Sequence, residues 1–427
     1  MESDKLGSEA GESGPTWAEL LGRDNWEGLL DPLDMGLRRL LLRSGDFIQA
    51  TYDTFISDRN SKYCGASRYG KHDFFHKVMM ENGEDYRVVS FLYGTARVSK
   101  KENFLFHSKS REAWDRESNW IGYIAVTSDE KSRQLGRREI YVAWRGTIRD
   151  YEWIDVLGAA PDPIQSLLNK NDPTHNSAKK QHWKASSSSD DDDDDDDRVP
   201  KVMRGWVTIY VTEDPKSPFT KLSARTQLHQ KLAELRRIYE GESLSITFVG
   251  HSLGASLSIL SAFDVVENGI RDIPVAAFVF GCPSVGNKAF DERCKRYPNL
   301  KFLHVRNKID VIPHYPGRLL GYADSWSELE IDTRKSPYLK DSKNPSDWHN
   351  LQAMVHVVAG WNGEKADFDL KVKRSVALVN KSCNFLKDEC LVPGSWWVEK
   401  NKGMVQEKNG GWTMAEPEEE DRPVPEF

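Results

Sequence analysis

The sequence predicts an α/β fold: one mostly parallel sheet with helices on both faces, helices before it, and an irregular C-terminal extension after it. Three observations support this fold class. Short apolar runs of strand length recur between residues 122 and 305, segments with helical spacing lie between them, and a glycine-rich turn joins one such strand to an apolar helix. Strands that are nearly continuously apolar are typical of parallel sheets buried on both faces. The 427 residues are interpreted as a single domain.

The elements follow in chain order. The β-rich runs GYIAVT and EIYVAW predict two neighbouring strands at residues 122–127 and 139–144. A strand is also expected near Trp206. Ser217 and Pro218 are expected to begin an amphipathic helix, because apolar residues recur from Leu222 to Ile238 in steps of three and four. Then come a strand at 244–249, a buried helix at 255–266, and strands at 275–280 and 302–305.

Charge is distributed unevenly along the chain. Lys and Arg number 59 and Asp and Glu 66, so the formal net charge is −7, but eight of the acids form one run, Asp190–Asp197. Without that run the balance is 59 − 58 = +1. Such a chain does not fit a nucleic-acid binder that neutralises phosphates. We expect a body at residues 24–405, a polar, disordered insert at 159–200, and flexible ends at 1–23 and 406–427.

Hydropathy and cysteine content indicate a cytosolic protein. No apolar run approaches the ~20 residues that span a bilayer. The N-terminal residues lack the apolar segment of a secretory signal. The five cysteines are odd in number and irregularly spaced, which suits reduced thiols better than a disulfide framework, and no Cys-x-x-Cys pair suggests a zinc site. We therefore expect no structural zinc site.

The glycine-rich turn reads Gly250-His251-Ser252-Leu253-Gly254, a G-x-S-x-G pattern between an apolar strand and an apolar helix. A nucleophilic serine on a strained strand-to-helix turn needs small residues two positions before and after it. The turn also places the serine at a helix N-terminus, where free amides favour developing negative charge. Ser252 is therefore the candidate nucleophile; an ordinary strand-helix turn is the alternative.

A serine nucleophile needs a base, and the base needs an orienting acid, in the chain order Ser, Asp or Glu, His. Asp310 follows the strand at 302–305 and is the candidate acid; the alternative is a turn-capping Asp. His349, at the start of an expected helix, is the candidate base. His356, two turns further along, fits a buried packing role, and His314 a loop or pocket wall.

Two amides are needed to bind the oxyanion of acyl transfer. One belongs to Leu253, and the other to Thr147, which follows the strand at 139–144 in an Arg-Gly-Thr turn. The next residues, 148–157, are short and amphipathic and form a candidate lid over an active site. Its candidate residues are Ile148, Tyr151, Trp153, Ile154 and Leu157; a helix packed into the core is the alternative.

These motifs together resemble a class 3 lipase: ITFVGHSLGA at 246–255, the Arg-Gly-Thr turn, and the Asp310 and His349 pair. The stretches NWEGLLDP (25–32), YDTF (52–55), SNWIGY (118–123) and ECLVPGSWWVEKNK (389–402) are similar to plant class II phospholipases A1. The resemblance implies an α/β-hydrolase fold and a cytosolic enzyme that hydrolyses the sn-1 acyl ester of glycerophospholipids at a membrane or micelle surface, without a cofactor. It also implies that the reaction needs neither a metal nor an organic cofactor, and that the helix after Thr147 is the lid.

Two other functions stay open at this point. One is a lipase of the same fold that acts on mono- or triacylglycerol or galactolipid, since no motif reports the acyl pocket. The other is a non-catalytic lipase-like regulatory protein, although only 78 residues (427 − 349) follow His349. The sequence does not indicate an oligomeric state.

Overall fold

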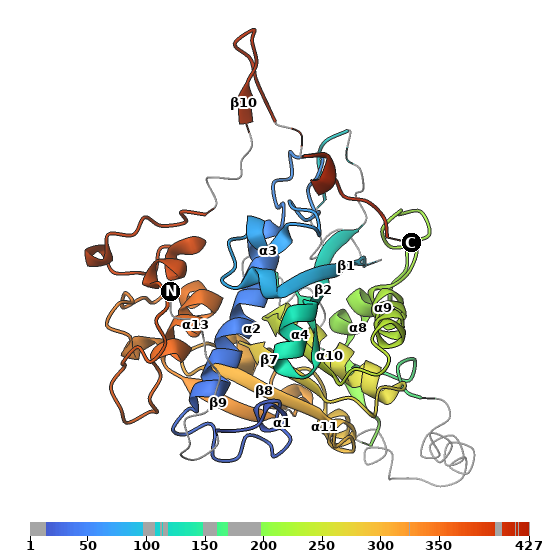
Figure 1. The fold of residues 1–427 in the computed structure, drawn as a ribbon, viewed down its shortest axis with the longest axis vertical. Coiled ribbons are helices and arrows are strands. Elements are labelled where there is room, and N and C mark those ends of the chain that lie inside the picture. The colour runs from blue at the N-terminus through green and yellow to red at the C-terminus, as the bar shows by residue number, and fades with distance from the viewer. Residues whose placement is uncertain are drawn as a thin grey trace.

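A seven-stranded sheet forms the centre of the computed structural model (Figure 1). The structure describes residues 14–96, 107–111, 113, 118–147, 160–169, 198–323, 325–397, 404–414, 416 and 418–426. The sheet order is β1-β2-β3-β6-β7-β8-β9. Strands β3, β6, β7, β8 and β9 are parallel, and β1 and β2 extend one edge in antiparallel pairing. The expected fold class, a mostly parallel sheet covered by helices, is confirmed.

The strands of this sheet are β1 (Tyr86–Gly94), β2 (Asn119–Thr127), β3 (Arg138–Trp144), β6 (Leu244–His251), β7 (Val275–Phe280), β8 (Leu300–Asn307) and β9 (Ser327–Ile331). Two small antiparallel pairs join β4 (Pro161–Pro163) to β5 (Lys201–Met203) and β10 (Met404–Gln406) to β11 (Trp412–Met414). The described helices include α1 (Trp17–Leu20), α2 (Met35–Thr54), α3 (Phe74–Lys77), α4 (Asp129–Leu135), α8 (Arg204–Val211), α9 (Ala224–Ile238), α10 (Leu253–Glu267), α11 (Lys288–Lys295), α12 (Pro345–Trp348) and α13 (Leu351–Gly360).

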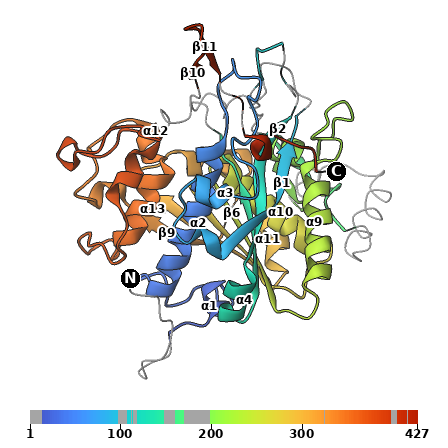
Figure 2. The same cartoon turned by 45° about the horizontal axis from the view of Figure 1, so that its top comes forward.

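Two apolar layers cover the two faces of the sheet. Successive residues of β3 alternate between them: Ile140 and Val142 belong to the layer formed with α8, α9 and α10, while Tyr141 and Ala143 belong to the layer formed with α2 and α13. This alternation is the period of a β-strand, and it explains why apolar residues follow one another without interruption in the middle of β3, from Ile140 to Trp144. Figure 2 shows the two groups of helices on opposite sides of the sheet.

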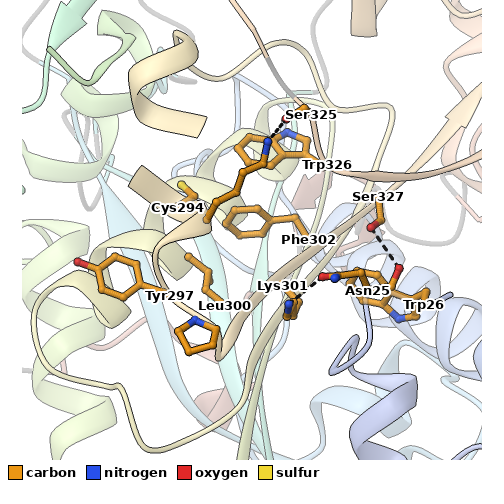
Figure 3. Close-up of a pocket in the computed structure, with 12 residues that line it drawn as sticks. Asn25, Trp26, Cys294, Tyr297, Leu300, Lys301, Phe302, Ser325, Trp326 and Ser327 are labelled. Carbon is orange, nitrogen blue, oxygen red and sulfur yellow. Dashed lines mark hydrogen bonds between the residues drawn. The ribbon is translucent and has the colours of Figure 1, made fainter. Parts of the chain in front are cut away.

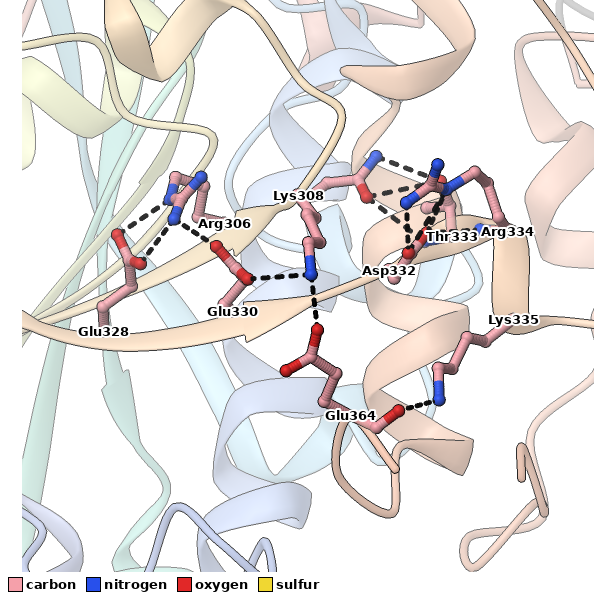
Figure 4. Close-up of polar contacts among 10 residues, drawn as sticks. Arg306, Lys308, Glu328, Glu330, Asp332, Thr333, Arg334, Lys335 and Glu364 are labelled. Atoms are coloured by element: carbon pink, nitrogen blue, oxygen red, sulfur yellow. Dashed lines mark hydrogen bonds and ion pairs between the residues drawn. The ribbon is translucent and has the colours of Figure 1, made fainter. Parts of the chain in front are cut away.

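Strand β9 is the edge strand beside β8, and its outward face is charged. Arg306 pairs with Glu328 at 2.9 Å and also with Glu330, and Lys308 pairs with Glu364 at 2.5 Å (Figure 4). Charged side chains on an edge strand discourage pairing with another chain. The network also joins the end of β8 to β9 and to the segment after α13.

The N-terminal segment is attached to the amino end of β8. Lys301 donates a hydrogen bond to Asn25 Oδ1 at 2.7 Å, and Trp26 lines a cavity of about 370 Å³ with Tyr297, Phe302 and Trp326 (Figure 3). This cavity is at the amino end of β8.

Two expected elements differ in the structure. The helix expected after Ser217 and Pro218 begins instead at Ala224, because Ser223 Oγ accepts the Thr226 N–H at 3.2 Å and caps it. The segment around Trp206, expected to be a strand, is helix α8. Its β-rich composition is overridden because Trp206, Ile209 and Tyr210, at helical spacing, are all buried against the core.

The expected boundaries also differ in part. Residues 17–20 form α1, capped by Thr16. Within the expected polar insert, Ile164 and Leu167 are fully buried in the core. The acidic tail contacts the body through Asp421, which accepts the Gly70 N–H at 2.6 Å and pairs with Lys77 at 2.7 Å. The Asp190–Asp197 run and the lid segment 148–157 lie outside the described residues.

Candidate active site

The turn between β6 and α10 carries Ser252 in a backbone conformation that L-residues rarely adopt, with φ 59° and ψ −128°. The flanking glycines explain how the turn fits. A Cβ on Gly250 would lie 2.1 Å from the Gly254 carbonyl oxygen, and one on Gly254 would lie 2.3 Å from the Trp144 carbonyl oxygen. Only glycine fits at both positions, so these two glycines are what allow the strained turn to form.

Asp310 and His349 meet at the carboxyl edge of the sheet. His349 Nδ1 lies 2.5 Å from Asp310 Oδ2, and Asp310 Oδ1 accepts the Ile312 N–H at 3.0 Å. The carboxylate is 1% exposed and the imidazole 8%. Because a carboxylate can only accept, the His349 proton is on Nδ1, which leaves the lone pair on Nε2.

Ser252 and His349 contact the same short segment, Phe280–Gly281, after β7. The Ser252 N–H donates to the Phe280 carbonyl at 3.1 Å. Gly281 has φ +53°, and a Cβ there would lie 2.8 Å from His349 Cε1 and 3.2 Å from Asp310 Oδ2. Nucleophile, base and acid candidates therefore all lie against one peptide.

Asn307 fixes the segments that carry the acid and the base. Its side-chain amide donates to the Trp348 carbonyl at 2.7 Å, one residue before His349, and its side-chain oxygen accepts the Thr333 N–H at 3.1 Å. Its own carbonyl accepts the Asp310 N–H at 2.9 Å. Asn307 is fully buried, so these bonds are shielded from water.

The alternative histidines lie elsewhere. His356, in α13, hydrogen bonds Ser336 Oγ at 2.8 Å, and burial lowers its pKa to about 4. His314 is exposed in the loop after Asp310. His304, in β8, accepts the Cys282 N–H at 2.9 Å, and burial lowers its pKa to about 4. The histidine that hydrogen bonds Asp310 is His349.

The expected oxyanion residues flank the same turn. Leu253 is the first residue of α10 and is 2% exposed. Thr147 follows β3, whose last residue, Trp144, is paired with Gly250 of β6. A Cβ on Gly146 would lie 2.6 Å from the His251 carbonyl oxygen, so the turn that carries Thr147 packs directly against the turn at residues 250–254, called the elbow below. The candidate lid residues Ile148, Tyr151, Trp153, Ile154 and Leu157 lie outside the described residues.

Comparison with known proteins identifies the family of this chain. The model of the family described as lipase (class 3) matches residues 141–320, which include Thr147, Ser252 and Asp310. Phospholipase A1-IIdelta of Arabidopsis thaliana is 59% identical over 413 residues, covering 96% of this chain and 98% of that protein. The chain belongs to the phospholipase A1-II family. The resemblance seen in the sequence is thus confirmed.

Other members of the phospholipase A1-II family align over similar lengths. Phospholipase A1-II 5 of Oryza sativa subsp. japonica is 47% identical over 428 residues, covering 98% of this chain and 87% of that protein. Among solved structures, the Lip2 lipase of Yarrowia lipolytica aligns with a TM-score of 0.42 and 17% identity, over 71% of this chain and 81% of that chain.

The described part of this phospholipase A1-II family member contains no helix long and apolar enough to cross a membrane, and no group of three metal-ligating side chains. Its five cysteines, all described, form no disulfide. Three residues at the site were not expected from the sequence: Gly281, Asn307, and Tyr52, whose hydroxyl lies 2.8 Å from His251 Nδ1, next to Ser252. The glycine directly after the strand at 275–280 was the one local signal, because active-site loops gather at that edge of the sheet.

Proposed function

We propose that this protein is a phospholipase A1, a serine hydrolase that cleaves the sn-1 acyl ester of glycerophospholipids such as phosphatidylcholine. The observation that carries the proposal is the strained Ser252 turn beside the buried His349 and Asp310 pair. The names of the relatives at 59% and 47% identity support the substrate class.

The proposed reaction is a two-step acyl transfer. His349 Nε2 takes the Ser252 hydroxyl proton as Oγ attacks the ester carbonyl, and Asp310 stabilises the resulting imidazolium. The amides of Thr147 and Leu253 bind the oxyanion. The tetrahedral intermediate collapses, His349 gives its proton to the departing lysophospholipid oxygen, and water then repeats the sequence on the acyl-enzyme.

Access to a lipid surface is part of the proposal, and the loop after Asp310 supports it. Leu319 is fully exposed, and Val311 and Leu320 are about half exposed, at 51% and 49%. The loop is attached to the segment after β7, because the Tyr315 carbonyl accepts the Ser284 N–H at 2.9 Å. Exposed apolar side chains beside an active site are suited to contact with lipid.

A cytosolic location belongs to the same proposal. The absence of disulfides among the five described cysteines supports it, since the cytosol keeps thiols reduced. Recovery of the protein with the cytosolic fraction of its own cells would test this, and recovery in a secreted or organellar fraction would contradict it.

The reaction is tested with phosphatidylcholine that carries different acyl chains at the two positions. We expect early release of the sn-1 fatty acid and no release by Ser252→Ala. Ser258→Ala is the matched control. Ser258 is buried like Ser252 but lies inside α10, where its hydroxyl donates to the Gly254 carbonyl at 2.8 Å, so this variant should keep its activity. Release from sn-2 first, or turnover by Ser252→Ala, would overturn the proposal.

A further inference from the structure

Tyr52 and His251 together connect the three segments that the proposed reaction uses. Tyr52 comes from helix α2, and His251 precedes Ser252 in the elbow. We infer that this pair positions three parts of the site relative to one another, without touching the substrate. These parts are the turn around Ser252, the base His349, and the turn that carries Thr147, called the oxyanion turn. The inference rests on the proposed function.

His251 binds the backbone of the candidate base. Its Nε2 lies 2.9 Å from the His349 carbonyl oxygen, and the two imidazole rings are 4.5 Å apart between centroids. A carbonyl oxygen can only accept, so Nε2 carries the proton and Nδ1 is an acceptor. Burial lowers the pKa of His251 well below its usual value, and nearby His349 lowers it further. His251 is therefore neutral and in one tautomer at neutral pH.

The acceptor atom of His251 is occupied by Tyr52. The Tyr52 hydroxyl lies 2.8 Å from His251 Nδ1 and donates to it, because that nitrogen carries no proton. Burial raises the pKa of the Tyr52 phenol, which keeps it protonated. The direction of both hydrogen bonds, from Tyr52 to His251 and from His251 to the His349 backbone, is therefore fixed.

Tyr52 also contacts the oxyanion turn. A Cβ on Gly146 would lie 2.0 Å from the Tyr52 hydroxyl oxygen, so the Gly146 backbone and that hydroxyl are in direct contact. On the other side of the same residue, Arg145 Nη1 donates to the Gly146 carbonyl at 2.8 Å. The N–H of Thr147 belongs to the same peptide plane as that carbonyl and points the opposite way. These contacts therefore set the direction of a candidate oxyanion donor.

Helix α2 is a rigid support for Tyr52. The neighbouring Asp53 pairs with Lys381 at 2.5 Å, and the Asp53 carbonyl accepts the Trp397 indole N–H at 3.1 Å. A Cβ on Gly45 would lie 2.3 Å from Val355, so α2 and α13 are in close contact. Helix α2 lies outside residues 141–320, so the N-terminal part of the chain supplies a residue to the core site.

Loss of the Tyr52 hydroxyl should lower kcat and leave KM unchanged, because the pair orients reacting groups and does not bind substrate. We expect Tyr52→Phe to lower kcat about tenfold on a soluble short-chain ester, with KM within about twofold of wild type, and to slow fluorophosphonate labelling similarly. Tyr123→Phe is the matched control. Its hydroxyl is also buried and also contacts α2, donating to the Phe47 carbonyl at 2.7 Å, so kcat should not change.

A double-mutant cycle tests whether Tyr52 acts through His251. In His251→Gln, the side-chain amide can still donate to the His349 carbonyl, but it offers Tyr52 no equivalent acceptor. Adding Tyr52→Phe to His251→Gln should therefore lower kcat by less than Tyr52→Phe lowers it in the wild type, because only the contact of the hydroxyl with Gly146 remains to be lost. Thermal melting checks that each variant is folded, and if Tyr52→Phe does not fold, His251→Gln alone should lower kcat with KM unchanged.

The outcomes separate the two proposals. The positioning role would be overturned, and the proposed function would stand, by any of three results. These are a wild-type kcat in Tyr52→Phe, an equal loss of kcat in Tyr123→Phe, or fully additive losses of kcat in the cycle. A folded wild-type protein that neither hydrolyses the ester nor reacts with the fluorophosphonate would overturn the proposed function, and the positioning role with it.

Discussion

Gly281 offers the sharpest structural test of the site, because any side chain there meets the candidate base. An added Cβ would lie 2.8 Å from His349 Cε1, whereas ordinary contact begins at 3.4 Å, so the ring must move by about 0.6 Å (3.4 − 2.8). Catalytic groups tolerate displacements of roughly 0.5 Å, and 1 Å can cost about 100-fold. We expect Gly281→Ala to lower kcat about 10- to 100-fold. The positive φ adds a stability loss of about 1 kcal/mol.

Gly136→Ala separates the two effects. Gly136 has φ +66°, but a Cβ there would meet nothing within 4 Å. This variant should therefore lose about 1 kcal/mol of stability with an unchanged kcat. The assay is kcat on a soluble ester together with the melting temperature of each variant. Wild-type kcat in Gly281→Ala, or an equal loss of kcat in Gly136→Ala, would refute the reasoning.

Three further predictions concern strain, pH and lipid contact. The backbone conformation of Ser252 costs roughly 1–3 kcal/mol of strain, which glycine relieves. Ser252→Gly should therefore be about 1 kcal/mol more stable than Ser252→Ala in calorimetry, and both variants should be inactive. Equal or lower stability of the glycine variant would contradict the strain. Burial lowers the pKa of His356 to about 4 from its ordinary 6.5, so the folded protein resists a proton that the unfolded chain accepts. The contribution of His356 to the free energy of unfolding is then full above pH 6.5 and falls by about 3 kcal/mol toward pH 4. His356→Gln should flatten that part of the curve in pH-dependent melting, and an unchanged slope would exclude this contribution. Replacing Leu319 and Leu320 by Ser should raise KM on phospholipid vesicles about tenfold without changing turnover of a soluble ester. Ile238 is 53% exposed and lies near the amino end of β6, so the control Ile238→Ser should change neither value. A vesicle KM that does not change would show that the loop does not contact lipid.

The sequence was sufficient where a local pattern determines the structure. Strand β7 has the expected bounds, Val275–Phe280, because it is a continuous apolar run between turns. The elbow was recognisable because two glycines and a serine at fixed spacing are sterically required there. Asp310 followed from its place after a predicted strand, and His349 from chain order and its place at the start of an expected helix; the structure brings them into contact.

Features that depend on tertiary packing were not predictable in the same way. Trp206 lies in a β-rich run, yet that run is a helix because its apolar face packs against the core. The contact between Tyr52 and His251 joins residues 199 positions apart and depends on where α2 packs. The tail residue Asp421 lies in a segment expected to be flexible, but it pairs with Lys77 at 2.7 Å.

The central claim, that Ser252 is an activated nucleophile oriented by His349 and Asp310, is tested most directly by covalent labelling. The folded protein is treated with a fluorophosphonate, and the modified residue is mapped by mass spectrometry. We expect one label, on Ser252, with its rate reduced at least about 100-fold in His349→Ala. No label, a label on another serine, or a label on Ser252 that forms as fast without His349 would contradict the account.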